Sequence, residues 1–295
     1  MEGKRIEREI SRTAEFTCMV RAMSFYEKKH QFRSDDYIAP VLVPKFFLLL
    51  IRIGPFKYIF KHLIFPKGMY EYVVARTKFI DLIFQNAMKS RFDQILIFGA
   101  GFDSRSTRFA ELNKTTRFFE LDAPVTQNAK INQLKKRGIE INPDTVFISI
   151  DFNKESIEEK LLESGFKKNE KSLFVLEGLT MYLDSEAIDN SFKIIDEFAG
   201  NDSEIVFDYI YSSVLRGENR YYGESEVYNG VKDRDEPWCF GIEEGEIVSF
   251  LENKNLKLIQ NLNSKDLERK YFEDNGKILS KINGTHAICH AKVIN

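Results

Sequence analysis

The chain has 295 residues, enough for one large domain or two of ordinary size. Hydrophobic residues make up 43% and charged residues 30%, which excludes a disordered, collagen-like or low-complexity chain. The 43 basic and 45 acidic side chains give a formal charge of −2, so the sequence lacks the positive field that sequence-independent binding to nucleic acid requires.

The cysteines and the N-terminal residues indicate the cellular compartment in which we expect the protein. Cys18, Cys239 and Cys289 are odd in number and widely spaced, which argues against a disulfide framework or a cysteine zinc site. Residues 1–10 are charged and contain no apolar run typical of a signal peptide. We therefore expect a cytoplasmic protein. The four histidines show no metal-ligand spacing with one another or with the cysteines, so we expect no bound metal.

Residues 1 to about 90 read as a helical preface to the first strand. Residues 41–65, VLVPKFFLLLIRIGPFKYIFKHLIF, are the most apolar part, but their longest uncharged run, residues 46–51, is too short to span a membrane. Two interpretations of this segment remain. One is a pair of amphipathic helices that covers a core or a pocket, which we favour, and the other is association with a membrane surface.

From residue 94 onwards, apolar strand-like runs alternate with helix-like segments. The expected strands are residues 94–98, 116–121, 145–150, 173–176 and 204–209, and the expected helices are residues 123–137, 154–164, 185–198 and 243–254. This alternation predicts an α/β fold with a mostly parallel sheet and helices on both faces. Residues 256–262 and 285–294 are two further strands, and residues 263–284 between them show no helix-length periodic segment. We therefore expect an antiparallel pair at the edge of the sheet.

Residues 211–241 form a second unusual segment, long, charged and rich in tyrosine, which is typical of a functional loop. The chain has no internal repeat and no linker rich in Pro, Gly or Ser. We expect a single domain over residues 1–295, with an N-terminal helical cap at 1–90 and a core at 91–295 that carries a lid at 211–241. Cap and lid are expected to enclose a ligand. The alternative is that the cap only covers the sheet and that residues 211–241 are a solvated loop.

A glycine turn follows the first expected strand. Gly99 and Gly101 allow the backbone to turn tightly and to approach a ligand, although a purely structural turn would also explain them. The dinucleotide fingerprint requires glycine where Ser104 stands, which disfavours NAD. The turn is compatible with a nucleoside ligand that lacks a pyrophosphate.

Acidic residues end the next three strands. Asp122, 23 residues after Gly99, is placed to hold a ribose diol, or else to cap the following helix. Asp151 and Phe152 suit the amino group and ring of adenine, or Asp151 caps a helix. Glu177 faces the ligand crevice at the end of its strand, or is satisfied by a loop amide. Together these residues predict a pocket for a nucleoside that bears a cationic group, and S-adenosylmethionine fits that description.

Several motifs together resemble those of the leucine carboxyl methyltransferase family. They are, in chain order, SRTAE, VART, FGAGFDSRSTRF, FFELDAP, the Asp151-Phe152 step, LEGLTMYL and residues 241–250. The similarity covers nearly the whole chain and points to the family's microbial branch of O-methyltransferases, which includes polyketide enzymes similar to the tetracenomycin O-methyltransferase. It implies S-adenosyl-L-methionine as the cofactor. It also implies a Rossmann-like class I methyltransferase fold, a mostly parallel seven-stranded sheet with a C-terminal antiparallel pair and an N-terminal helical cap.

The resemblance also implies which residues bind the cofactor. Arg76 would grip its carboxylate, Asp122 would hold the ribose and Glu177 would take the amino group. Gly99 and Gly101 would line the cofactor, and Asp151 and Phe152 would contact the adenine. For Arg76, an ion pair on the surface with Asp81 or another acid is the alternative.

The expected reaction is methyl transfer to a carboxylate or hydroxyl of a small organic or polyketide-like acceptor. A protein C-terminal carboxyl methyltransferase and a non-catalytic cofactor-binding scaffold are the alternatives. Methyl transfer needs positioning and exclusion of water rather than a nucleophilic side chain, so no catalytic residue is assigned. A hydroxyl acceptor would need a base, for which His286 and His290 are candidates, although histidines on an edge strand without a catalytic partner are the simpler interpretation. The expected residues on the acceptor side are Tyr209, Tyr211, Arg216 and Trp238.

Overall fold

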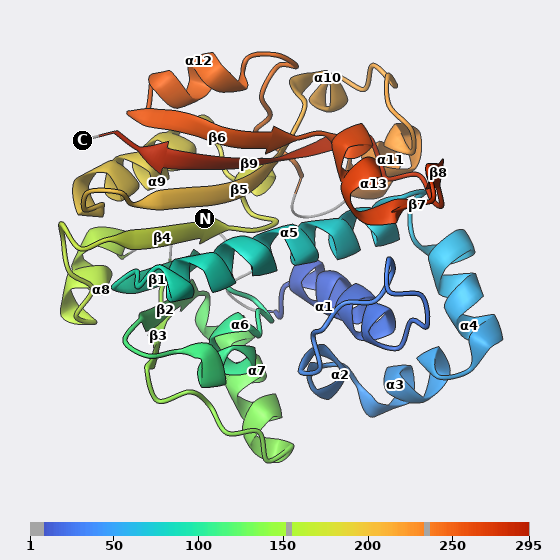
Figure 1. The fold of residues 1–295 in the computed structure, drawn as a ribbon, viewed down its shortest axis with the longest axis horizontal. Coiled ribbons are helices and arrows are strands. Elements are labelled where there is room, and N and C mark those ends of the chain that lie inside the picture. Colours follow the sequence, from blue (N-terminus) through green and yellow to red (C-terminus); the bar gives the residue numbers. More distant parts are fainter. Residues whose placement is uncertain (1–8, 152–154, 233–236, 295) are drawn as a thin grey trace.

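The computed structural model describes residues 9–151, 155–232 and 237–294 and places a seven-stranded sheet at the centre of the protein (Figure 1). The strands stand in the order β3-β2-β1-β4-β5-β9-β6. Their bounds are β1 Gln94–Phe98, β2 Arg117–Asp122, β3 Thr145–Ser149, β4 Ser172–Leu176, β5 Glu204–Ile210, β6 Leu256–Leu262 and β9 His286–Val293. Strands β1 to β5 are parallel, and β9 runs antiparallel to both β5 and β6, so the expected α/β sheet with its antiparallel pair is confirmed.

Both faces of the sheet are covered, which explains why its strands read as continuous apolar runs. On β1, Ile95 and Ile97 belong to one core cluster, whereas Leu96 and Phe98 belong to the other. The first face is covered by α5 (Met69–Lys89), α7 (Pro124–Lys136) and α13 (Ser264–Phe272), and the second by α8 (Ile157–Glu163), α9 (Ser185–Phe198) and α12 (Ile247–Glu252).

The preface to the sheet is helical, as expected. Its elements before α5 are α1 (Arg12–Phe25), α2 (Ala39–Leu42), α3 (Lys45–Ile51), α4 (Gly54–Ile59) and the π-helical turn η2 (Phe60–Ile64). The favoured interpretation of residues 41–65, helices that cover a core or a pocket, holds for part of the segment. Its buried members of a core cluster are Leu42, Val43, Phe47, Ile51 and Phe65. Neither α4 nor η2 buries any residue. None of the described helices is long and apolar enough to cross a membrane.

Short helices connect the strands on the side of the sheet where β1, β4 and β5 end. They are α6 (Arg105–Arg108), the 3₁₀ turns η3 (Ala110–Leu112) and η4 (Thr180–Tyr182), α10 (Ser212–Leu215) and α11 (Glu224–Lys232). The segment expected as a loop at 211–241 therefore contains two helices. The Glu224 carboxylate accepts the backbone N–H groups of Asn219, Arg220 and Tyr221 at 2.6–2.9 Å, which closes the turn between these helices.

The stretch between the last two strands was expected to lack a helix, and that expectation is wrong. It contains α13 and a small hairpin of β7 (Glu273–Asp274) and β8 (Lys277–Ile278). Helix α13 has only nine residues, is mostly charged and buries only Leu267 and Phe272, so it offers few apolar positions in the sequence. A capping box formed by Asn263 and Asp266 marks its beginning.

Candidate functional site

The glycine turn after β1 is tight and packs closely against α1. Gly99 and Gly101 both have positive φ, 58° and 48°, a conformation that L side chains rarely adopt. A Cβ on Gly101 would lie 2.9 Å from the Cβ of Ala14, and one on Gly99 would lie 3.2 Å from Leu179. Glycine is therefore required here both by the backbone conformation and by the approach of α1.

Asp122 lies at the end of β2 and is tied to the glycine turn. Its Oδ2 accepts the N–H of Gly101, and its Oδ1 accepts the N–H of Ala123 at 2.6 Å. Burial raises the pKa of Asp122 to about 6, although both hydrogen bonds oppose that rise. The alternative that Asp122 caps the following helix is wrong, because α7 has Ala123 as its N-cap and no capping side chain.

Asp151 follows β3 and is half-buried. Its N–H donates to the Glu155 carboxylate at 2.8 Å. The next helix, α8, is capped by Ser156, whose hydroxyl accepts the N–H of Glu159 at 3.3 Å. The helix-cap alternative for Asp151 is therefore wrong as well. Phe152 lies outside the described residues, so its predicted contact with adenine stays a prediction.

Glu177 follows β4 and is held by two arginines rather than by a loop amide. Arg76 donates from Nε at 2.9 Å, and Arg105 donates from Nη1 at 2.6 Å. Burial opposes the ionisation of Glu177, but the charges of Arg105, Arg76 and Arg21 outweigh it and lower its pKa to about 2. Glu177 is therefore a carboxylate at every physiological pH.

Arg76, on α5, joins the ends of β4 and β5. Besides Glu177 it contacts Asp208 of β5, with 2.6 Å between Nη1 and Oδ2. Asp208 also accepts the hydroxyl of Tyr72 at 2.9 Å and the N–H of Gly178 at 2.6 Å. Arg76 is thus buried and paired with acids, but these are Glu177 and Asp208, not the Asp81 that the sequence analysis named as an alternative.

Further arginines and acids extend this network, and of these only Asp81 was named from the sequence, as an alternative partner of Arg76. Arg105 is fully buried and contacts Asp81, Asp103 and Glu177. Arg108 also pairs with Asp81, at 2.7 Å. The available signal was the motif FGAGFDSRSTRF, which carries Asp103, Arg105 and Arg108 immediately after the glycine turn.

The network reaches α1 through a separate pair. Arg21 donates to Asp36 at 2.9 Å and to the carbonyl of Phe102 at 2.7 Å. Asp36 also accepts the hydroxyl of Ser104 at 2.8 Å. This pair fixes the preface to the backbone that follows Gly101. The whole network contains four arginines and five carboxylates, one negative charge in excess: Arg21, Arg76, Arg105, Arg108, Asp36, Asp81, Asp103, Glu177 and Asp208.

His286 lies at the start of β9, opposite Ile210 at the carboxyl end of β5. Its ring centroid is 4.4 Å from that of Tyr72 and 5.3 Å from that of Trp238. The expectation of an edge strand is wrong here, because β9 runs between β5 and β6. His290 is remote from this cluster and pairs with Glu204 at 2.7 Å.

Hydrogen bonds to neighbouring residues define the tautomer of His286. The Asn283 Oδ1 accepts both the N–H and the hydroxyl of Thr285, at 3.1 and 2.5 Å. Because the Thr285 proton is used there, the His286 Nδ1, 2.7 Å from the Thr285 oxygen, must carry a proton and donate it. The lone pair therefore lies on Nε2. Burial and the charge of Arg76 lower the pKa of His286 to about 3, which keeps the ring neutral.

The structure brings one of the four predicted acceptor-side residues to this cluster. Trp238 contacts His286, and its Nε1 is buried without a hydrogen-bond partner in the described part of the chain. Tyr209 lies on the opposite face of β5 from Asp208, where its hydroxyl reaches Asn261 at 3.3 Å. Tyr211 stacks on Tyr221, with 4.9 Å between the ring centroids. Arg216 is exposed and ion-paired with Glu243.

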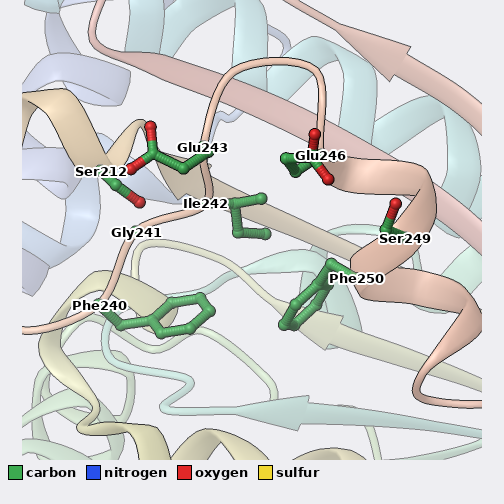
Figure 2. A pocket seen from close by; sticks show the side chains of 8 residues that line it. All are labelled: Ser212, Phe240, Gly241, Ile242, Glu243, Glu246, Ser249 and Phe250. Carbon is green, nitrogen blue, oxygen red and sulfur yellow. The ribbon is translucent and has the colours of Figure 1, made fainter.

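Two cavities lie outside this network. One, of about 290 Å³, is bounded by the carboxylates of Glu243 and Glu246 and by the rings of Phe240 and Phe250 (Figure 2). The other, of about 410 Å³, lies between α1 and α7 and touches Phe102 of the glycine turn. Neither is lined by Asp122 or Glu177. In the described residues, no group of three or more His, Cys, Asp or Glu side chains is arranged to hold a metal ion.

Known proteins resemble this chain in sequence. A Bacillus subtilis (strain 168) protein, provisionally named S-adenosyl-L-methionine-dependent methyltransferase YktD, is 28% identical over 73% of this chain and 70% of its own length. A Mycobacteroides abscessus protein with the same provisional description is 28% identical over 60% of this chain and 64% of its own. Other mycobacterial relatives match over about half of their length.

A solved structure and the model of a protein family are also similar to this chain. An S-adenosylmethionine-dependent methyltransferase from Clostridium acetobutylicum ATCC 824 is 14% identical, with a TM-score of 0.49 over 82% of this chain and 99% of that chain. The profile of the leucine carboxyl methyltransferase family matches residues 14–196. Because this match spans more than half of the sequence, the chain belongs to the leucine carboxyl methyltransferase family.

Proposed function

We propose that this chain transfers a methyl group to a carboxylate or hydroxyl of a small organic or polyketide-like acceptor. The family to which the chain belongs and its similar relatives identify it as a methyltransferase that depends on S-adenosyl-L-methionine. The observation that carries the small-acceptor proposal is the buried group of Arg76, Asp208, His286 and Trp238 beside Glu177.

The residues at the strand ends fit the cofactor by their chemistry. Carboxylates suit its hydroxyl and ammonium groups, so we assign Asp122 to the ribose and Glu177 to the amino group. Gly99 and Gly101 form the backbone turn along which it would lie, and Asp151, with Phe152, is assigned to the adenine. The excess negative charge of the arginine–carboxylate network also complements the net positive charge of this cofactor.

We assign Arg76 to bind the carboxylate of the cofactor with one nitrogen of its guanidinium. Its Nε and Nη1 are directed at Glu177 and Asp208, so Nη2 is the nitrogen left for a ligand. The two acids thereby fix the plane of the guanidinium, and a fixed fork recognises a carboxylate better than a mobile charge does.

The chemistry needs little from the protein beyond positioning. The bound cofactor supplies a methyl group on a sulfonium, ready for in-line attack by an oxygen. The chain's own side chains have to hold the acceptor oxygen in line and exclude water. For a hydroxyl acceptor, we assign the Nε2 lone pair of His286 as the group that accepts the proton. It is a weak base in the free protein, because burial and the charge of Arg76 lower the pKa of His286 to about 3.

The acceptor side is best explained by a small molecule. The N–H of Trp238, which has no partner among the described residues, offers a buried donor, and His286 offers a buried acceptor beside it. A buried polar group without a partner carries a free-energy cost that a ligand oxygen would relieve. We further propose that the preface at 1–90 and the segment at 211–241 enclose this ligand within a single domain. The C-terminus of a protein chain would have to pass through that enclosure.

Labelled cofactor tests the proposal directly. The protein is incubated with S-adenosylmethionine labelled in the methyl group and with an extract of its host cells. The extract is divided beforehand into a small-molecule fraction and a protein fraction. Label in the small-molecule fraction, absent with heat-inactivated protein, is the expected result. Label in the protein fraction would favour carboxyl methylation of a chain end. Cofactor binding without any transfer would favour a scaffold.

Arg76→Lys is expected to weaken the binding of S-adenosylhomocysteine by about 1 kcal/mol, or roughly fivefold. Lysine keeps the positive charge but loses the planar fork that Glu177 and Asp208 orient. Calorimetric titration measures the change. Arg117→Lys, at an exposed arginine of β2, is the matched control. Equal affinity for Arg76→Lys and the control would show that geometry does not matter at this position.

Cofactor binding is expected to release a proton near pH 6. In the free protein the pKa of Asp122 is about 6, so part of the population is protonated there. Hydroxyl groups that donate to the carboxylate favour its charged form and lower this pKa, so affinity should fall as the pH drops below 6. Titration calorimetry in two buffers with different ionisation enthalpies measures the proton. Asp122→Asn should abolish its release.

A further inference from the structure

An arm of the protein, residues 45–64, exposes large apolar side chains. It comprises α3, α4 and η2, and α3 and α4 lie at the edge of the molecule in Figure 1. Six of its side chains are between 45% and 74% exposed: Phe46, Leu49, Ile53, Tyr58, Leu63 and Ile64. Exposed apolar side chains gathered on one segment are typical of an interaction site.

The arm has two different sides. On the inner side, Phe47 packs on Phe60 and Phe60 on Phe65, with 5.2 and 6.1 Å between ring centroids. Phe46 and Leu49, the exposed large apolar residues of α3, are three positions apart, which places them on one helical face. Phe47 and Ile51 belong to a core cluster, so the inner side joins the arm to the body of the protein. The outer apolar side is left exposed by the part of the chain that the structure describes.

The charge of this region has one sign. Residues 37–70 contain five Lys or Arg and no Asp or Glu. Lys57 and Lys61 are directed at the body of the protein, where they pair with Glu27 and Glu71 at 3.1 and 2.8 Å. Lys45 and Arg52 are exposed at the two ends of α3. Arg52 donates to the hydroxyl of Tyr26 at 3.2 Å, so it too is directed at the body of the protein. A partner of this surface must therefore be apolar with a negative rim.

We propose that the outer side of the arm docks on the surface of a lipid bilayer with anionic headgroups. Its apolar side chains would enter the boundary between headgroups and acyl chains, with the exposed Lys45 at the level of the phosphates. Tyr58 has the amphipathic ring that such an interface favours. A second copy of the chain fits less well, because two arms packed together would bring cations against cations with no acid between them.

Flotation with vesicles tests this docking, and it does not depend on the methyl acceptor. The full chain is mixed with vesicles of equal parts phosphatidylcholine and phosphatidylglycerol, and with vesicles of phosphatidylcholine alone. Binding to the anionic vesicles is expected, weakened by high salt. The double variant Phe46→Ser, Leu63→Ser should bind at least about tenfold more weakly. Leu162→Ser, at a similarly exposed leucine of α8, is the matched control and should bind like the unaltered protein.

Each contrary outcome has a distinct meaning. No binding to anionic vesicles, or equal binding by the double variant, would overturn the proposal. A dimer in vesicle-free solution that the double variant dissociates would instead assign the arm to a second copy. Thermal stabilisation by S-adenosylhomocysteine should be the same in all three proteins, because the arm lies outside the proposed cofactor site. Its loss in every one of them would count against the proposed function and leave the docking result intact.

Discussion

Arg105→Ala is expected to lower the free energy of unfolding by about 3–5 kcal/mol, the largest loss of stability that we predict. Arg105 is fully buried and pairs with Asp81, Asp103 and Glu177. Removing the guanidinium leaves these carboxylates close together, partly desolvated and short of a counter-charge. Denaturant unfolding at neutral pH measures the difference.

The pH dependence of that loss identifies its electrostatic origin. In the folded protein the pKa of Glu177 is about 2, and in an unfolded chain it is about 4.3. The stabilisation of the folded protein by the ionised Glu177 is therefore complete above about pH 4.3 and is lost as the pH falls towards 2. The difference in the free energy of unfolding between Arg105→Ala and the unaltered protein should therefore decrease over that pH range. Arg117→Ala, at an exposed site, should change stability by only about 0.5 kcal/mol, and a similarly small effect of Arg105→Ala would contradict the account.

Much of the sheet was predictable because its signals are local. Each parallel strand is a short apolar run, and burial on both faces gives that run its composition. The glycine turn and the acids Asp122, Asp151 and Glu177 were located because they follow such runs directly. The carboxyl ends of neighbouring parallel strands meet at one edge, so their side chains were expected to converge.

The charge network was not predictable, because its pairs are distant in the sequence. Arg76 and Asp208 are 132 residues apart, and Arg105 and Glu177 are 72 apart. The motifs VART and FGAGFDSRSTRF mark these arginines, but nothing in the local pattern indicates which carboxylates they pair with. The position of β9 inside the sheet was hidden for the same reason, because strand order depends on tertiary packing rather than on periodicity.

The exposed side of the arm, residues 45–64, could not be predicted from apolar periodicity. Apolar residues at helical spacing normally indicate a face turned to the core, and that rule holds for α9, which buries Ile188, Phe192 and Ile195. In α3, apolar residues at helical spacing stand on two sides, and Phe47 and Ile51 are buried whereas Phe46 and Leu49 are exposed. Periodicity indicates that a helix has an apolar side but does not identify what covers it.

Asp122→Ala is expected to weaken the binding of S-adenosylhomocysteine by about 1–3 kcal/mol, or roughly 5- to 150-fold. Two effects act together. The proposed ribose hydroxyls lose a charged acceptor, and the buried N–H of Gly101 loses its partner, which loosens the glycine turn. Calorimetric titration measures the affinity, and denaturant unfolding confirms that the variant is folded.

Asp122→Asn separates these two effects. The amide keeps one oxygen that accepts the Gly101 N–H, so the turn should hold, but the charge and one acceptor are gone. If charge dominates, Asn and Ala variants should bind equally weakly, and the affinity of both should no longer vary around pH 6. If the turn dominates, Asn should restore most of the affinity. Unchanged affinity in a folded Ala variant would remove Asp122 from the cofactor site and would leave its buried carboxylate as a structural anchor of the turn.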